Sequence, residues 1–360
     1  MAHYKDKLRQ DLDRWIAGGL VNADNREAIL ATVPDARRLD AATALAWVGG
    51  LLLGIAVISF VAANWDVTPK LVRFAIILIA FLGFAGAAAW TARAKREVAS
   101  NILLMLAALI FAAAIGLTGQ IFDIAGDPRA ASYGAGLAAL ALALAGRSTG
   151  AATAGLIFVA LGDFSDNRWF SGAESDAPAM LLAAPLCAYL ALRWGSAALA
   201  HVSAIAIVYC FAWFGARQED DAAVFLFLSI VMGAMAAAAR WLRSQDRQFA
   251  SIFYGWFAWG ALMFFAIAGY LPWFNESDRH TAGMIHRVFW LLLSGGALAL
   301  GRYDNHNLVT TVGVLSIIGA ICALLVDLGM DLLASAGVFL LCAVIALVAG
   351  LALRKRGSAA

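Results

Sequence analysis

Four polar residues beside apolar segments have the side-chain types that could bind a small solute or a cation. Gln120, Asp123 and Asp127 follow the apolar run 102–119, and Asn64 ends an earlier run. If one helix continues through this stretch, spacings of three and seven residues place Gln120, Asp123 and Asp127 on one face. Two carboxylates and an amide oxygen could coordinate a hard cation or accept a protonated solute. The alternative is an interfacial helix end whose acids are hydrated and whose Gln120 bonds a neighbouring helix.

A second group of polar residues surrounds His286 and Arg287, at the start of a later apolar run, with His280 just before it. His286 could respond to pH near neutrality. The spacing of His280 and His286 matches no standard zinc pattern. Asp327 and Asp331 flank a short turn and are interpreted as turn and cap residues.

The remaining residues provide no recognisable catalytic set. No serine stands in a Gly-x-Ser-x-Gly turn. The four cysteines lie within apolar runs without a Cys-x-x-Cys pair, which is typical of small buried hydrophobes. No Asp, Glu, Lys or Arg lies in the middle of a predicted span, which disfavours coupling through a midplane carboxylate. We therefore expect no enzyme activity, no cofactor and no bound metal.

The elements that carry these residues are predicted to be transmembrane helices. The chain of 360 residues is 63% hydrophobic, and its apolar runs are continuous rather than alternating. A bilayer core about 30 Å thick requires about 20 mainly apolar residues per helix. The sequence predicts an all-α integral membrane protein with about twelve such helices, of which the sixth and the tenth are short. Their ranges are 43–63, 72–90, 102–119, 130–146, 149–163, 178–193, 198–215, 222–239, 251–271, 286–301, 308–326 and 332–353.

The distribution of charge predicts the orientation of these spans. When the N-terminus is placed in the cytoplasm, most of the 26 basic residues fall on the cytoplasmic side and more than half of the 24 acidic residues fall outside. Basic residues in short loops mark the cytoplasmic side. This pattern predicts cytoplasmic termini. The Ala- and Gly-rich composition favours a multi-pass protein of the bacterial inner membrane, in contact with the lipid bilayer. The net charge of +2 gives no indication of nucleic acid as a partner.

The polar N-terminal segment, residues 1–40, is predicted to be a cytoplasmic helical hairpin, followed by the helix bundle 41–353 and a basic tail 354–360. Leu8, Leu12 and Trp15 have helical spacing, and the glycines after residue 17 end this helix. Asn22 or Asp24 is expected to cap a second short helix. The hairpin could seal the bundle or bind a cytoplasmic protein partner.

Several short motifs in the first third of the chain carry a family resemblance. They are Trp15-Ile16-x-x-Gly19-Leu20-Val21, Ile29-Leu30, Ala62-Ala63-Asn64-Trp65, and Gly119-Gln120-Ile121-Phe122 followed by Gly126-Asp127. In order and spacing they resemble a bacterial membrane-protein family, domain-of-unknown-function family 2157, over about residues 8–128. Phe122 and Asp123 stand where the family usually has Tyr and His. The resemblance implies a cytoplasmic hairpin joined to many spans, without an established activity.

Two functions follow as hypotheses. The first is transport or sensing of a small solute or ion through an outward-facing polar site near Gln120, Asp123, Asp127 and Asn64. The alternative is a non-transporting scaffold or regulatory protein whose hairpin binds a cytoplasmic partner.

Overall fold

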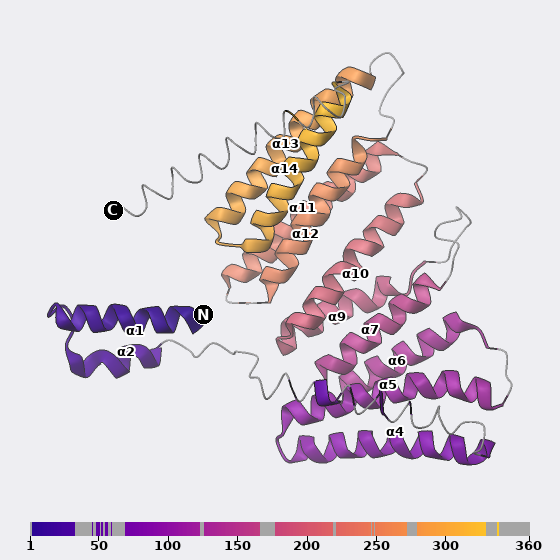
Figure 1. The fold of residues 1–360 in the computed structure, drawn as a ribbon. Coiled ribbons are helices and arrows are strands. Elements are labelled where there is room, and N and C mark those ends of the chain that lie inside the picture. Colours follow the sequence, from indigo (N-terminus) through magenta and orange to yellow (C-terminus); the bar gives the residue numbers. More distant parts are fainter. Residues whose placement is uncertain are drawn as a thin grey trace. The chain divides into compact units, whose positions relative to one another are not determined.

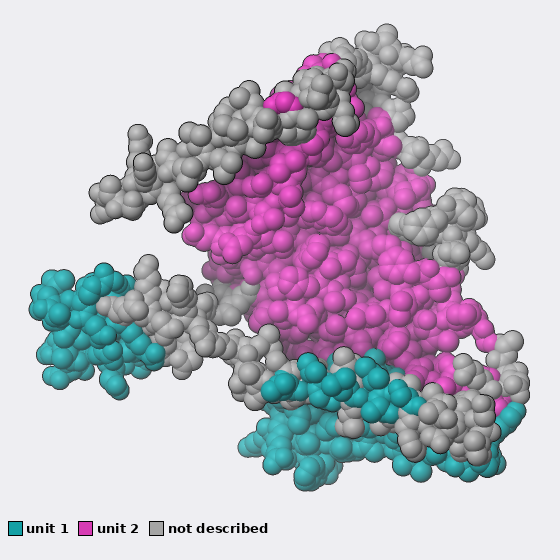
Figure 2. Space-filling view, viewed as in Figure 1, with its two compact units in different colours: residues 1–110 teal, residues 111–360 magenta. Residues whose placement is uncertain are grey.

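A computed structural model describes residues 2–32, 69–122, 126–165, 177–218, 221–245, 249–271 and 279–328, with scattered single positions outside these ranges. The described residues form helices and connecting turns, without a strand among them. The chain divides into two compact units, residues 1–110 and 111–360 (Figure 2).

The first unit begins with a helical hairpin. Helix α1 (Ala2–Ala17) is followed by the 3-10 turn η1 (Ala23–Asn25) and helix α2 (Arg26–Thr32). Gly19 adopts φ +70°, a left-handed conformation that glycine accepts readily, and the chain leaves α1 there. Of the two residues expected to cap the second helix, Asn22 accepts from the backbone N–H of Asp24 and caps η1, which precedes α2.

An exposed ion pair and two buried leucines link the two hairpin helices. Arg26 donates from Nε to Asp13 at 2.9 Å. This hydrogen bond to Arg26 lowers the pKa of Asp13, and the carboxylate in turn raises the pKa of Arg26. Leu12 and Leu30 are buried in this hairpin.

The first unit also contains helix α4 (Lys70–Arg93) and the beginning of helix α5 (Glu97–Ile121). A tight turn joins them, in which Lys95 has φ 57°. The Ser100 hydroxyl donates to the backbone carbonyl of Ala88 at 3.1 Å and ties the start of α5 to α4.

The second unit contains the end of α5 and eight further helices among its described residues (Figure 1). They are α6 (Pro128–Gly146), α7 (Thr149–Phe164), α9 (Met180–Trp194), α10 (Ala197–Ala216), α11 (Ala222–Ser244), α12 (Ala250–Ala268), α13 (Arg279–Tyr303) and α14 (Asn307–Asp327). Consecutive helices pack as the hairpins α6–α7, α9–α10, α11–α12 and α13–α14, and α10 also contacts α7 and α12.

Small residues and hydroxyl groups allow these helices to pack closely. A Cβ on Gly313 of α14 would lie 2.7 Å from the backbone nitrogen of Leu298 in α13. In the same hairpin, Trp290 donates to the Ser316 hydroxyl at 2.8 Å, and the Ser294 and Ser316 hydroxyls are 2.7 Å apart. Close backbone approach and interhelical hydrogen bonds are what stabilise helix pairs in lipid, where the hydrophobic effect between helices is weak.

Ten described helices coincide with the second to the eleventh predicted spans, and eight of them are long and apolar enough to cross a membrane. The expected short sixth span is the 15-residue α9, and the fifth is also short, the 16-residue α7. The tenth span was expected to be short, but α13 has 25 residues because the helix begins before its apolar part. The predicted first and twelfth spans, 43–63 and 332–353, fall outside the continuously described residues.

Candidate functional site

The structure does not form one continuous helix through Gln120, Asp123 and Asp127. Helix α5 ends at Ile121, and Asp127 is the N-cap of α6, where it accepts from the backbone N–H of Arg129 at 2.9 Å. The premise of one shared helical face is therefore wrong for Asp127. Its carboxylate instead satisfies a backbone donor in the first turn of the next helix.

The side chains of the other three members of the predicted site lie outside the description. Asn64 and Asp123 lie outside the described residues, and Gln120 is in the last turn of α5 without a described side chain. The assignment of a solute or cation to Gln120, Asp123, Asp127 and Asn64 stays a prediction.

The most deeply buried charged side chain of the described spans is Arg287, near the beginning of α13. Its side chain is 3% exposed, and its Nε donates to Asp327 at the end of α14 across 3.0 Å. Its guanidinium lies over the ring of Tyr270, 4.1 Å from the ring centre. We call Tyr270, His286, Arg287 and Asp327 the Arg287 cluster. Asp327, interpreted from the sequence as a turn residue, is therefore an ion-pair partner.

The backbone of α12 makes room for this cluster. His286 stacks on Phe265 with ring centres 4.3 Å apart and planes 15° apart. Gly269 caps the end of α12, and a Cβ there would lie 2.3 Å from His286 Nδ1 and 2.4 Å from Arg287 Nη1. A side chain at position 269 would thus displace both polar groups, so the glycine is required by the close approach.

One donor of Arg287 has no acceptor within the described residues. Nη1 is buried and makes no hydrogen bond to any of them. A guanidinium has five N–H donors in a planar fork that matches a carboxylate or a phosphate. Because Asp327 binds through Nε, the opposite edge of the fork could receive an anionic group.

A second buried polar group joins α6, α7 and α9. Asp163, 9% exposed, accepts from the Tyr133 hydroxyl at 2.6 Å and from the backbone N–H groups of Ala179 and Met180 at 2.8 and 3.0 Å. Arg129 donates to the Tyr133 hydroxyl at 3.1 Å. The carboxylate thus caps the beginning of α9, and its oxygens are used by the fold itself.

Asp304 lies in the turn between α13 and α14, at the end of α13 that is far from Arg287. We call Asp304 and its partners Arg240 and Tyr254 the Asp304 clamp. Arg240 donates to both carboxylate oxygens of Asp304, at 2.6 and 2.8 Å, and Tyr254 donates to one of them at 3.1 Å. The hydrogen bond from Arg240 lowers the pKa of the Asp304 carboxyl. His306 in the same turn contacts the backbone carbonyl of Ser251 at 2.8 Å. These contacts connect the α11–α12 hairpin to the α13–α14 hairpin.

Sequence reasoning singled out His286 and Arg287 but missed the partners that define their environment. It also missed Asp163 and the Asp304 clamp. A signal was available for Arg287, since a basic residue close to the start of an apolar run on the acidic side of the membrane needs a partner. Within the described part of the chain, no group of three His, Cys, Asp or Glu residues is placed to hold a metal ion.

The comparison with known proteins concerns the first part of the chain. No curated protein and no solved structure gave a match. Residues 13–152 match a family model described as "Predicted membrane protein (DUF2157)". The matched stretch runs from α1 into α7 and includes all the motifs that carry the resemblance. The match confirms that resemblance over residues 13–152, where the chain is similar to this family of predicted membrane proteins.

Proposed function

We propose that the protein binds a small solute at the outer side of a bacterial inner membrane, in order to transport or to sense it. The observation that carries this proposal is the buried Arg287, whose Nη1 has no acceptor among the described residues. Ionisable groups within membrane spans are costly and generally mark a functional site or a pairing partner. A solute with a carboxylate or another anionic group would use this donor.

The proposed topology places the Arg287 cluster at the outer surface. It comprises twelve spans with both termini in the cytoplasm, the hairpin 1–40, the bundle 41–353 and the tail 354–360. Fusion of a topology reporter after Asp176 should then report the periplasm, and fusion after Arg243 should report the cytoplasm. The opposite result at either position would contradict the twelve-span arrangement.

A ligand screen on the purified full-length protein tests the binding site. Small carboxylates, inorganic anions and cations are added separately, and the thermal unfolding of the protein is measured. A ligand at about 100 times its dissociation constant should stabilise the folded state by about 2.7 kcal/mol. We expect an anion to give this effect, because the available group is a cationic donor.

Two arginine variants make the screen specific. Arg287→Lys keeps the charge but loses the planar fork, so the stabilisation by the anion should disappear. Arg217→Lys is the matched control, because Arg217 also lies over an aromatic ring, 4.9 Å from the centre of Trp213, but is exposed. Equal stabilisation of both variants, or no stabilisation by any anion, would refute an Arg287 site. Stabilisation by cations alone would favour the predicted site at Gln120, Asp123, Asp127 and Asn64.

The second candidate function is a scaffold that binds a cytoplasmic protein through the α1–α2 hairpin. It is favoured by the exposed apolar side chains of this hairpin, since Trp15 is 42% and Leu20 is 78% exposed. In a strain whose phenotype depends on the protein, a scaffold predicts that deleting residues 1–38 abolishes function and that Arg287→Lys is silent. A solute-binding protein predicts loss of function with Arg287→Lys. Both functions are non-catalytic.

A further inference from the structure

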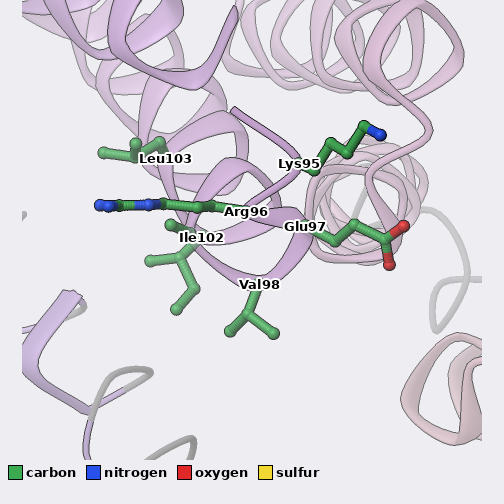
Figure 3. A pocket seen from close by; sticks show the side chains of 7 residues that line it. Lys95, Arg96, Glu97, Val98, Ile102 and Leu103 are labelled. Carbon is green, nitrogen blue, oxygen red and sulfur yellow. The ribbon is translucent and has the colours of Figure 1, made fainter. Parts of the chain in front are cut away.

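An open depression of about 690 Å³ lies beside the turn between α4 and α5. Its lining comes from that turn and from the first two turns of α5: Lys95, Arg96, Glu97, Val98, Ala99, Ile102 and Leu103. In Figure 3 the Arg96 side chain points to the same side as Ile102 and Leu103, whereas Lys95 and Glu97 project to the other side. The volume is in the range of small-molecule binding sites.

The lining combines positive charge with apolar surface. Arg96 is exposed and forms no ion pair with a described residue, and Lys95 and Arg93 are further basic groups of the same turn. Ile102 and Leu103 lie beside the Arg96 side chain (Figure 3), and Val98, 46% exposed, adds apolar surface to the lining. An occupant that complements both features has an anionic head attached to a hydrocarbon chain.

The position of the depression along the helices agrees with such an occupant. Helices α4 and α5 are both long and apolar enough to span a bilayer, so their shared turn lies at the membrane surface. Trp90, in the last turn of α4, is 66% exposed, and exposed tryptophans are enriched at the level of lipid headgroups. The charge pattern assigns this turn to the cytoplasmic leaflet, where anionic lipids attract basic segments.

The backbone around the depression is held in place by specific hydrogen bonds. The Arg96 N–H donates to the Thr91 carbonyl at 2.9 Å, and Ser100 donates to the Ala88 carbonyl at 3.1 Å. The base of the Arg96 side chain is therefore fixed relative to α4, although its guanidinium is exposed. The backbone of this site therefore does not have to order when a ligand binds, and the loss of conformational freedom falls on the exposed Arg96 side chain.

We propose that this depression binds one acidic phospholipid, whose phosphate is contacted by Arg96 and whose acyl chain lies along Val98 and Leu103. The site is independent of the solute site at Arg287, which lies on other helices. Arginine suits a phosphate because its planar fork donates two parallel hydrogen bonds. The bound lipid would stabilise the α4–α5 hairpin at the membrane surface.

The test measures thermal unfolding of the purified full-length protein in a neutral detergent, with increasing phosphatidylglycerol in the micelles. Phosphatidylcholine serves as the neutral lipid, and glycerol 3-phosphate serves as the soluble headgroup. We expect phosphatidylglycerol to raise the midpoint of unfolding in a saturable manner, and neither of the other two to do so at the same concentration. High salt should weaken the effect, because an exposed charge pair is screened.

The variant Arg96→Gln should lower the apparent affinity for phosphatidylglycerol about fivefold, the equivalent of about 1 kcal/mol for one basic residue at an anionic surface. Arg302→Gln is the matched control, because Arg302 is an exposed arginine at a helix end that the proposed topology also places in the cytoplasm, outside this depression. Its affinity for the lipid should be unchanged. Arg96→Lys should recover only part of the affinity, since lysine keeps the charge but binds phosphate as a point charge without the planar fork.

Three results would overturn the proposal. One is an equal effect of phosphatidylcholine, which would indicate nonspecific micelle effects. Another is an equal loss of affinity in Arg96→Gln and Arg302→Gln, which would indicate diffuse attraction to basic residues. The third is a full effect of glycerol 3-phosphate, which would indicate a soluble anion as the ligand.

Discussion

Replacement of Asp327 by asparagine should destabilise the protein strongly, because it leaves the buried charge of Arg287 without its counter-ion. The guanidinium Nε and the carboxylate are 3.0 Å apart, and the Arg287 side chain is 3% exposed. Removing one partner of a buried ion pair costs about 3–5 kcal/mol. Asp327 is 27% exposed, so water already screens part of the interaction, and we expect the lower end of this range.

The gross electrostatic attraction is consistent with that magnitude. At an effective dielectric constant of about 20, two unit charges separated by about 4 Å attract each other by about 4 kcal/mol. Asparagine retains a hydrogen-bond acceptor but no charge, so most of this attraction is lost. A double variant, Arg287→Met with Asp327→Leu, should recover the stability, because well-packed apolar residues can replace a buried ion pair without cost.

The assay is equilibrium unfolding of the purified protein in mixed micelles, monitored by helical circular dichroism. Asp221→Asn is the control, because Asp221 caps α11 through the backbone N–H of Ala223 and asparagine is an equally good N-cap. A loss below about 1 kcal/mol for Asp327→Asn, comparable to a surface pair, would refute the reasoning. A double variant no more stable than the single one would also refute it. If the double variant is stable but no longer binds the anion, Arg287 is required for binding and not for folding.

Four further variants, one of them a control, test separate parts of the structure. Gly313→Ala should push α13 and α14 apart and destabilise the protein by about 1–3 kcal/mol in the same assay. Gly296→Ala is the control and should be neutral or slightly stabilising, because a Cβ at this position meets no atom within 4 Å. The contribution of Asp304 to the free energy of unfolding should be fully present above the ordinary pKa of 3.8 and be lost as the pH falls through the lowered pKa of the folded state. In a pH series of unfolding curves, Asp304→Asn should remove this loss of stability in acid. Asp163→Ala should cost about 1–3 kcal/mol by leaving the first N–H groups of α9 unpaired, and hydrogen exchange should increase selectively at residues 179–180.

The N-terminal hairpin and the second to eleventh spans could be predicted from the sequence because their signals are local. Gly19 and Asn22 act within a few residues of their own position. Eight of these ten described helices coincide with apolar runs of about the length that a bilayer requires, and α7 and α9 are shorter. The prediction of one helical face through Asp127 failed because cap formation competes with helix continuation, and the short side chain of Asp127 satisfies the next helix instead.

The Arg287 cluster illustrates what local signals leave out. Arg287 and Asp327 are 40 positions apart, Phe265 comes from a third helix, α12, and Tyr270 lies in the turn that follows α12. Their meeting depends on the rotation of α12, α13 and α14 about their axes and on the missing side chain at Gly269. The same holds for Asp163, whose partners lie on α6 and at the beginning of α9.

The sequence by itself determined that the chain forms membrane-spanning helices, and the charge of its loops predicted their direction. The physical reason is that lipid provides no hydrogen-bond partners, so each apolar run must satisfy its own backbone within one helix. Only the tertiary structure decided which polar side chains pair with one another in the interior. It also decided that Nη1 of Arg287 has no acceptor among the described residues. Successive side chains point in directions about 100° apart around the helix axis. Which residues of two helices face each other therefore depends on how the helices pack, and the composition of either helix does not determine it.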